Sequence, residues 1–142
     1  MSNQLYFEDV KIGTELPTLE KTPTTQQLVM YAGASGDFYQ IHYDQDFARD
    51  NGLPNVIIHG ALKNAFLGQL LTDWIGQRGS IKKLAVEYRG MDMPGSKVYC
   101  RGLVTSKKIE DEIGIVECEI WLEDVSGKKT TPGKAIVALP LR

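Results

Sequence analysis

The sequence predicts an α+β protein in which one long buried helix is wrapped by a curved antiparallel sheet. The helix is expected over residues 60–74, because its apolar side chains cover most of its circumference and such a helix is normally buried. After Gly79 the apolar residues recur at every second position instead, as in strands with one buried face. A strand of about eight or nine residues reaches roughly 27–30 Å and a helix of about 15 residues roughly 22 Å, so the two elements match in length.

A shorter helix is predicted to start at Thr24, where Gln27 follows three residues later as in a capping box. We expect it to end near Gly33 and to be followed by a glycine-rich loop over residues 33–37. No strand is predicted before it, because residues 5–20 have a mixed pattern.

A second short helix is predicted between Asp44, its N-cap, and Asn51. Gly52 and Pro54 stand just beyond this segment, and both residue types commonly follow a helix end.

Strands are predicted over four segments after the long helix, and turns are expected at 94–95, 109–114 and 124–127. The strand segments are residues 84–89, 97–104, 116–122 and 134–139.

Composition narrows the class of protein. A chain of 142 residues with 42% hydrophobic residues fits a single domain over residues 1–142. The net charge of −2 gives no reason to expect a nucleic acid or an anionic membrane as partner, and no apolar run is long enough to span a bilayer. The start has no signal-peptide pattern, and Cys100 and Cys118 suggest no metal site. We therefore expect a cytoplasmic protein without a metal.

Both histidines of the chain lie in one stretch over residues 31–62. Asp37 stands five residues before His42, and His59 and Gly60 lead into the long helix. A carboxylate and an imidazole beside the N–H groups of a helix N-terminus suit proton transfer next to a carbonyl group.

This stretch resembles the MaoC-like dehydratases, also called hydratase 2 proteins, which have the hot-dog fold. Their pattern runs Tyr/Phe-Ala-x-x-Ser-Gly-Asp-x-Asn-Pro-Ile-His-x-Asp-x-x-x-Ala, followed later by His-Gly-Met-Leu. The resemblance covers residues 24–72 well and residues 84–104 more loosely. The matching residues here are Tyr31-Ala32, Ser35-Gly36-Asp37, Ile41-His42, Asp44, Ala48 and His59-Gly60-Ala61-Leu62.

The chain departs from the family pattern at a few positions. Tyr39 and Gln40 replace the family's Asn-Pro, Ala61 replaces methionine, and Lys63 stands where a serine is often found. These changes leave the Asp and His of the pattern intact. They place Tyr39 and Gln40 beside the expected substrate pocket.

By this resemblance Asp37 and His42 are the expected catalytic pair, and the Gly60 N–H is the expected donor to the oxygen of a thioester substrate. Which proton each member of the pair transfers stays open. Alternative roles also stay open: His42 could simply bond a nearby carbonyl, Asp37 could cap a turn, and Tyr39 could be core filler.

Two neighbouring residues are expected to have structural roles only. His59 is expected to order its loop by hydrogen bonding, and Ser35 to be a turn residue rather than a nucleophile, because no GxSxG elbow surrounds it.

The resemblance implies an (R)-specific enoyl-CoA hydratase or 3-hydroxyacyl thioester dehydratase of fatty acid or lipid metabolism. Its partner would be an acyl thioester, with coenzyme A or acyl carrier protein present only as part of the substrate and no separate cofactor. A homodimer or a heteromeric pair of hot-dog chains is expected. The alternative is a weakly catalytic thioester-binding subunit of a heteromeric dehydratase. A thioesterase ranks lower, because residues 60–72 contain no Asp or Glu.

Overall fold

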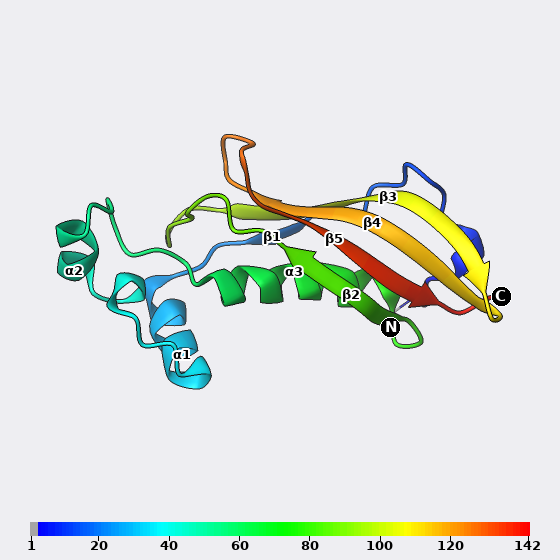
Figure 1. The fold of residues 1–142 in the computed structure, drawn as a ribbon, viewed down its shortest axis with the longest axis horizontal. Helices are drawn as coiled ribbons and strands as arrows, with labels where there is room; N and C mark the ends of the chain where they lie inside the picture. Colours follow the sequence, from blue (N-terminus) through cyan, green and yellow to red (C-terminus); the bar gives the residue numbers. More distant parts are fainter. Residues whose placement is uncertain (1–2) are drawn as a thin grey trace.

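A computed structural model describes residues 3–142. Five antiparallel strands form one curled sheet around a long helix, in the spatial order β1-β3-β4-β5-β2 (Figure 1). The strands are β1 (Leu19–Lys21), β2 (Ser80–Val86), β3 (Val98–Glu110), β4 (Ile113–Glu123) and β5 (Lys129–Leu139). The helices are α1 (Thr25–Ser35), α2 (Gln45–Asp50) and α3 (Gly60–Ile75), with 3-10 turns η1 (Phe7–Asp9) and η2 (Gln40–His42).

The α3 helix is the buried helix that the sequence predicts. It begins at Gly60 and ends at Ile75, one residue beyond the expected end, where Gly76 takes a positive φ of 76°. Leu67 and Leu71 are fully buried along it. In the described chain, no helix has both the length and the apolar character needed to cross a bilayer.

The strand alternation is confirmed in β3 and β4, whose alternate residues are buried against α3. The predicted hairpin connection over residues 109–114 is present but shorter than expected, because β3 and β4 stay paired up to a tight turn at Asp111 and Glu112. Both turn residues have positive φ, 50° and 63°, which closes a two-residue hairpin without separating the strands. The β5 strand also begins earlier than expected, at Lys129.

The β2 strand differs from the prediction at both ends. It begins at Ser80 and stops at Val86, so Tyr88 lies outside the sheet rather than on its inner face. Beyond Val86, the Glu87 and Arg89 N–H groups still bond to the Pro132 and Thr130 carbonyls. The segment that follows β2 then passes the start of α3, where the Tyr88 ring lies against Gly60.

The α1 helix continues beyond Gly33, where its end was expected. It stops at Gly36, whose left-handed φ of 78° and N–H bond to Ala32 close the helix. The predicted cap at Thr24 is confirmed, since its side chain accepts from the Gln27 N–H at 3.1 Å. The β1 strand was not predicted, because its three residues gain strand character only by pairing with β3.

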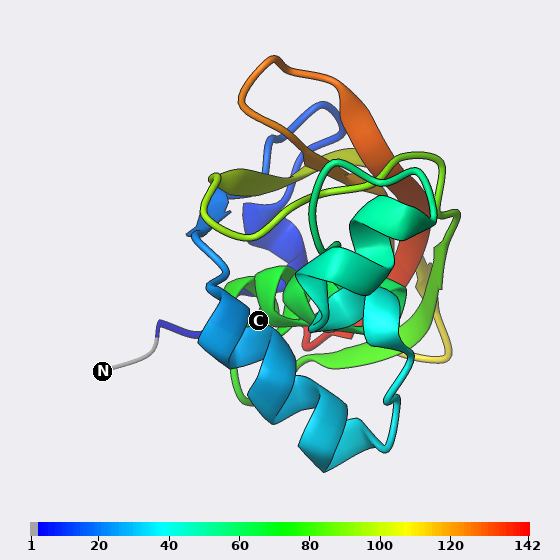
Figure 2. The same cartoon turned by 90° about the vertical axis from the view of Figure 1, so that its left-hand side faces the viewer.

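The α2 helix has the predicted cap. The Asp44 carboxylate accepts from the Phe47 N–H at 3.0 Å. Figure 1 shows α1 and α2 at the end of the molecule where α3 begins, and in Figure 2 this end faces the viewer. The η2 turn contacts both helices. This arrangement brings the residues between α1 and α3 to the N-terminus of the buried helix.

Candidate active site

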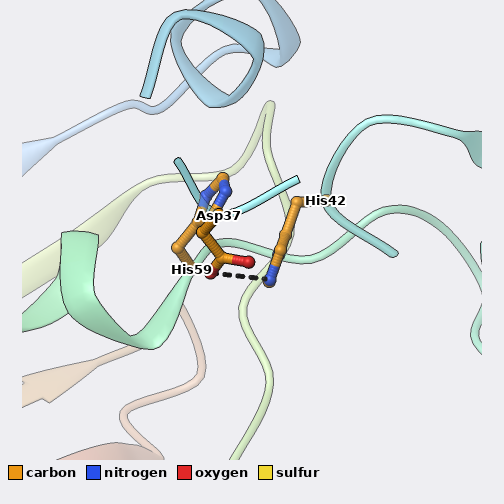
Figure 3. Close-up of side chains that lie close together, drawn as sticks. All are labelled: Asp37, His42 and His59. Carbon is orange, nitrogen blue, oxygen red and sulfur yellow. Dashed lines mark ion pairs between the residues drawn. The ribbon is translucent and has the colours of Figure 1, made fainter. Parts of the chain in front are cut away.

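Asp37 and His42 face each other at the N-terminal end of α3 (Figure 3). Asp37 follows the end of α1, and His42 is the last residue of η2. The Asp37 Oδ2 and His42 Nε2 atoms lie 3.8 Å apart, and the Asp37 side chain is 47% exposed while that of His42 is 8% exposed. The structure therefore brings the predicted pair together, with the carboxylate open to solvent and the imidazole set behind it.

Backbone contacts fix the orientation of the His42 ring. Its Nδ1 lies 2.8 Å from the Ile57 carbonyl oxygen, and the Ile57 N–H in turn donates to the Ile41 carbonyl at 3.0 Å. A carbonyl can only accept, so the proton of a neutral ring sits on Nδ1 and the Nε2 lone pair faces Asp37. The carbonyl contact considered as an alternative role for His42 is thus present and orients the ring.

Asp37 also shapes its own loop. Its Oδ1 accepts from the Tyr39 N–H at 3.4 Å, and its N–H donates to the Ser35 hydroxyl oxygen at 3.2 Å. The turn-capping alternative therefore holds for one carboxylate oxygen, while the other faces His42. Ser35 lies in this turn.

His59 does not play the role expected from the sequence. It is fully buried, and among the described residues neither of its ring nitrogens has a hydrogen-bond partner. Its ring stacks on His42 with centroids 3.8 Å apart and meets Tyr31 edge-on at 4.8 Å. The expectation that it orders the loop by hydrogen bonding is wrong, because aromatic contacts surround the ring instead.

The pKa of His59 is shifted below its ordinary value. Burial is the main cause, and the nearby His42 adds to it, while the charge of the Asp37 carboxylate acts in the opposite direction. His59 is therefore neutral at physiological pH.

Asp37, His42 and His59 place three possible ligand atoms within 4.8 Å of one another. The two imidazole planes, however, are inclined by only 20° and stacked. In-plane lone pairs of stacked rings run side by side rather than converging on one ion. The arrangement thus favours proton transfer over shared metal coordination.

Gly60 is the first residue of α3, and no side chain caps this helix end. The first N–H groups of a helix have no partner within the helix, so they are available to an acceptor at the site. The Tyr88 ring lies against Gly60, where an added Cβ would come within 3.0 Å of the ring. Burial raises the pKa of the Tyr88 phenol, with a smaller effect of Tyr31, so its hydroxyl stays protonated at neutral pH.

Tyr39 and Gln40 lie beside the pair. The Tyr39 ring meets the His42 ring edge-on with centroids 6.3 Å apart and is 52% exposed, so it is not core filler. Gln40 opens η2, and its carbonyl accepts from the Tyr43 and Asp44 N–H groups.

A buried ion pair close to the site was not predicted from the sequence. Lys63, on α3, is 2% exposed, and its Nζ lies 3.0 Å from the Asp92 Oδ2. A lysine within a helix that is apolar all round was the available signal. Its partner Asp92 lies 29 positions further along the chain, and no pattern in the sequence around Asp92 indicates that it is buried.

Comparison with known proteins agrees with this geometry. The MaoC-like domain model matches residues 8–123. An (R)-specific enoyl-CoA hydratase of Rhodospirillum rubrum is 30% identical, with 96% of this chain and 93% of that protein covered.

Solved structures share the fold. An (R)-hydratase of Pseudomonas aeruginosa has a TM-score of 0.88 at 18% identity, covering 98% of this chain and 88% of that one. The ChsH1-ChsH2 complex of Mycobacterium tuberculosis has a chain with a TM-score of 0.80 at 20% identity, covering 91% and 98%. This chain is a hot-dog fold protein and belongs to the MaoC-like domain family.

Proposed function

We propose that this protein is an (R)-specific enoyl-CoA hydratase, a hydro-lyase that adds water across the 2,3 double bond of an acyl thioester or removes it from the 3-hydroxyacyl product. The observation that carries the proposal is the 3.8 Å approach of Asp37 Oδ2 to His42 Nε2 beside an uncapped helix N-terminus. The similarity to the Rhodospirillum rubrum hydratase supports the same reaction.

The Asp37–His42 pair holds and activates the water. The separation of 3.8 Å is longer than a direct hydrogen bond, and both facing atoms are acceptors that can take the two hydrogens of one water molecule. In hydration the water oxygen bonds to C3, the pair takes one proton from that water, and one proton is delivered to C2. The pair thus ends each turnover in its starting protonation state.

Gly60 stabilises the charge that develops on the thioester oxygen. Its N–H lies at the positive end of the α3 dipole, and the absence of a side chain lets a substrate oxygen approach the backbone closely. Donors aimed at a developing oxyanion are often the largest single contribution to catalysis.

Tyr39 and Gln40 bind the acyl part of the substrate in this proposal. Tyr39 is exposed and edge-on to His42, so a substrate beside the pair would touch its ring. The thioester carrier, coenzyme A or acyl carrier protein, enters only as part of the substrate, and no separate cofactor takes part.

We further propose that residues 1–142 act as one domain in a cytoplasmic enzyme of fatty acid or lipid metabolism. The buried hydrophobic residues form one cluster, and the buried free thiols of Cys100 and Cys118 suit a reducing compartment.

We propose a homodimer as the working assembly. The sheet ends at β1 on one side and at β2 on the other, and an open edge strand is a ready site for pairing with another chain. A heteromeric hot-dog pair is the second possibility, supported by the fold shared with a chain of the Mycobacterium tuberculosis complex. A thioester-binding subunit with little chemistry of its own would not need the Asp37–His42 pair, which this chain keeps.

The test is an absorbance assay at the enoyl thioester band with crotonyl, longer and bulky CoA substrates. We expect the band to decrease with at least one substrate and chiral analysis to give the (R)-3-hydroxyacyl product. No loss of the band with any substrate, carried by coenzyme A or by acyl carrier protein, would contradict the proposal.

A further inference from the structure

A buried ion pair connects the start of α3 to the segment that follows β2. Lys63 Nζ donates to the Asp92 carboxylate and to the Gly90 carbonyl, both at 3.0 Å. The Thr130 hydroxyl donates to the same Asp92 oxygen at 2.6 Å. Lys63, Asp92 and Thr130 are 2%, 4% and 1% exposed, so the network is shielded from solvent.

This network lies where electrostatics alone would not place a lysine. A cation near a helix N-terminus is unfavourable, and helical side chains point back toward that end. Removing an ion pair from water is also costly. The pair therefore needs an explanation other than simple stability.

Hydrogen bonds connect this network to two parts of the site, the residues before His59 and the segment that carries Tyr88. The Asp92 carbonyl accepts from the Ile58 N–H at 2.8 Å, which ties it to the residue before His59. The Gly90 N–H bonds to the Thr130 carbonyl at 2.9 Å, and Gly90 follows Tyr88 by two residues. Tyr88 in turn lies against Gly60.

We propose that Lys63 and Asp92 are positioning residues for the hydration reaction. They hold the segment from Tyr88 to Asp92 against the first turn of α3, and this keeps the Tyr88 ring over Gly60 and the Gly60 N–H aimed at the thioester oxygen. Neither residue touches the substrate. This inference rests on the proposed hydratase function and adds to it the part of the molecule that fixes the oxyanion donor.

The test replaces both charges at once with apolar residues, as Lys63→Met with Asp92→Val. Removing one partner alone would leave an unpaired buried charge and destabilise the fold, whereas removing both is often tolerated. We expect the folded double variant to lose about tenfold or more in kcat, since small misplacements of catalytic groups are costly. Its Kd for the saturated thioester butyryl-CoA should stay within about threefold, because an oxyanion donor interacts much more strongly with the charge that develops in the transition state than with the neutral carbonyl of the bound thioester.

A milder pair of variants covers the case in which the double variant does not fold. Thr130→Val removes one hydrogen bond to Asp92 and keeps the shape of the side chain. Thr131→Val is the matched control, because Thr131 is also fully buried and its hydroxyl has no hydrogen-bond partner among the described residues. We expect kcat to fall severalfold in Thr130→Val only.

The possible results distinguish a failure of the positioning role from a failure of the proposed hydratase function. If the wild-type enzyme hydrates enoyl thioesters and the folded double variant keeps kcat within about twofold, or loses butyryl-CoA affinity in parallel with kcat, the positioning role is overturned while the hydratase function stands. Equal kcat values for the two threonine variants would overturn it as well. A wild-type protein with no hydratase activity would contradict both the hydratase function and the positioning role.

Discussion

The imidazole rings of His42 and His59 stack with 3.8 Å between their centroids and 20° between their planes. One ring faces the exposed Asp37 carboxylate, and the other is fully buried behind it. Two charged imidazoles at this distance would repel each other strongly. At most one of the two rings can therefore carry a charge, and burial, which lowers the pKa of His59, makes His59 the neutral one.

The lowered pKa of His59 predicts a loss of stability in mild acid. The unfolded chain takes up a proton near the ordinary pKa of about 6.5, while the folded chain resists it. The stability that the folded state gains by keeping His59 neutral is fully present above that pH. It is lost as the pH falls from about 6.5 toward the lower pKa of His59 in the folded state. Thermal unfolding from pH 8 to pH 5 should show this decrease.

The variant His59→Phe isolates that effect. It keeps an aromatic ring against His42 and Tyr31 and cannot titrate. Its Tm should depend less on pH between 6.5 and 5 than the wild-type Tm does. Identical pH dependence in the two proteins would show that His59 is not the group responsible.

The proposed catalytic roles of Asp37 and His42 can be tested with Asp37→Asn and His42→Ala. The first keeps the side-chain shape but removes the base, and the second removes the other proton-handling group. Each should lower turnover by at least roughly 10²–10⁴-fold, measured on the best substrate. Asp46→Asn, on the exposed first turn of α2, is the control and should keep wild-type turnover. Near-normal turnover in either test variant would mean that the assignment is wrong.

Two glycines of α3 allow a matched test of the oxyanion donor. In Gly60→Ala the new Cβ would meet the Tyr88 ring at 3.0 Å and would crowd the approach to the N–H, so kcat/KM should fall about tenfold or more. In Gly68→Ala the nearest atom is a Leu84 methyl at 3.8 Å, an ordinary contact. That variant should keep its activity and gain about 0.5–1 kcal/mol of stability. Equal activities would argue against a substrate oxygen at Gly60.

The substrate preference should depend on Tyr39 and Gln40. The double variant Tyr39→Asn with Gln40→Pro replaces an exposed ring beside His42. The ratio of kcat/KM between bulky and crotonyl-like thioesters should change by about tenfold or more, because one methylene in a pocket is worth roughly 1–3 kcal/mol. A constant ratio combined with altered stability would leave Tyr39 as a brace of the loop.

The proposed dimer can be checked by light scattering at micromolar concentration. The open edge at β2 is expected to pair with a second copy, so the measured mass should be about twice that of one chain. A monomer across this range would contradict the proposed assembly.

Local patterns in the sequence were enough for the elements that local interactions specify. The caps at Thr24 and Asp44 depend on a side chain bonding an N–H group three residues later, and these bonds form within a single turn. The α3 helix and the alternation in β3 and β4 follow from the period of apolar residues. The family resemblance of the loop motif predicted that Asp37 and His42 lie close together, and the structure places them so.

Contacts between distant residues were decided only by the tertiary structure. The β1 strand exists through its pairing with β3, and the stack of His42 on His59 depends on how two loops pack. Lys63 meets Asp92 across 29 positions of the chain. A sequence pattern reports the preferences of neighbouring residues, whereas burial and long-range pairing depend on the closure of the sheet around α3, which no local segment encodes.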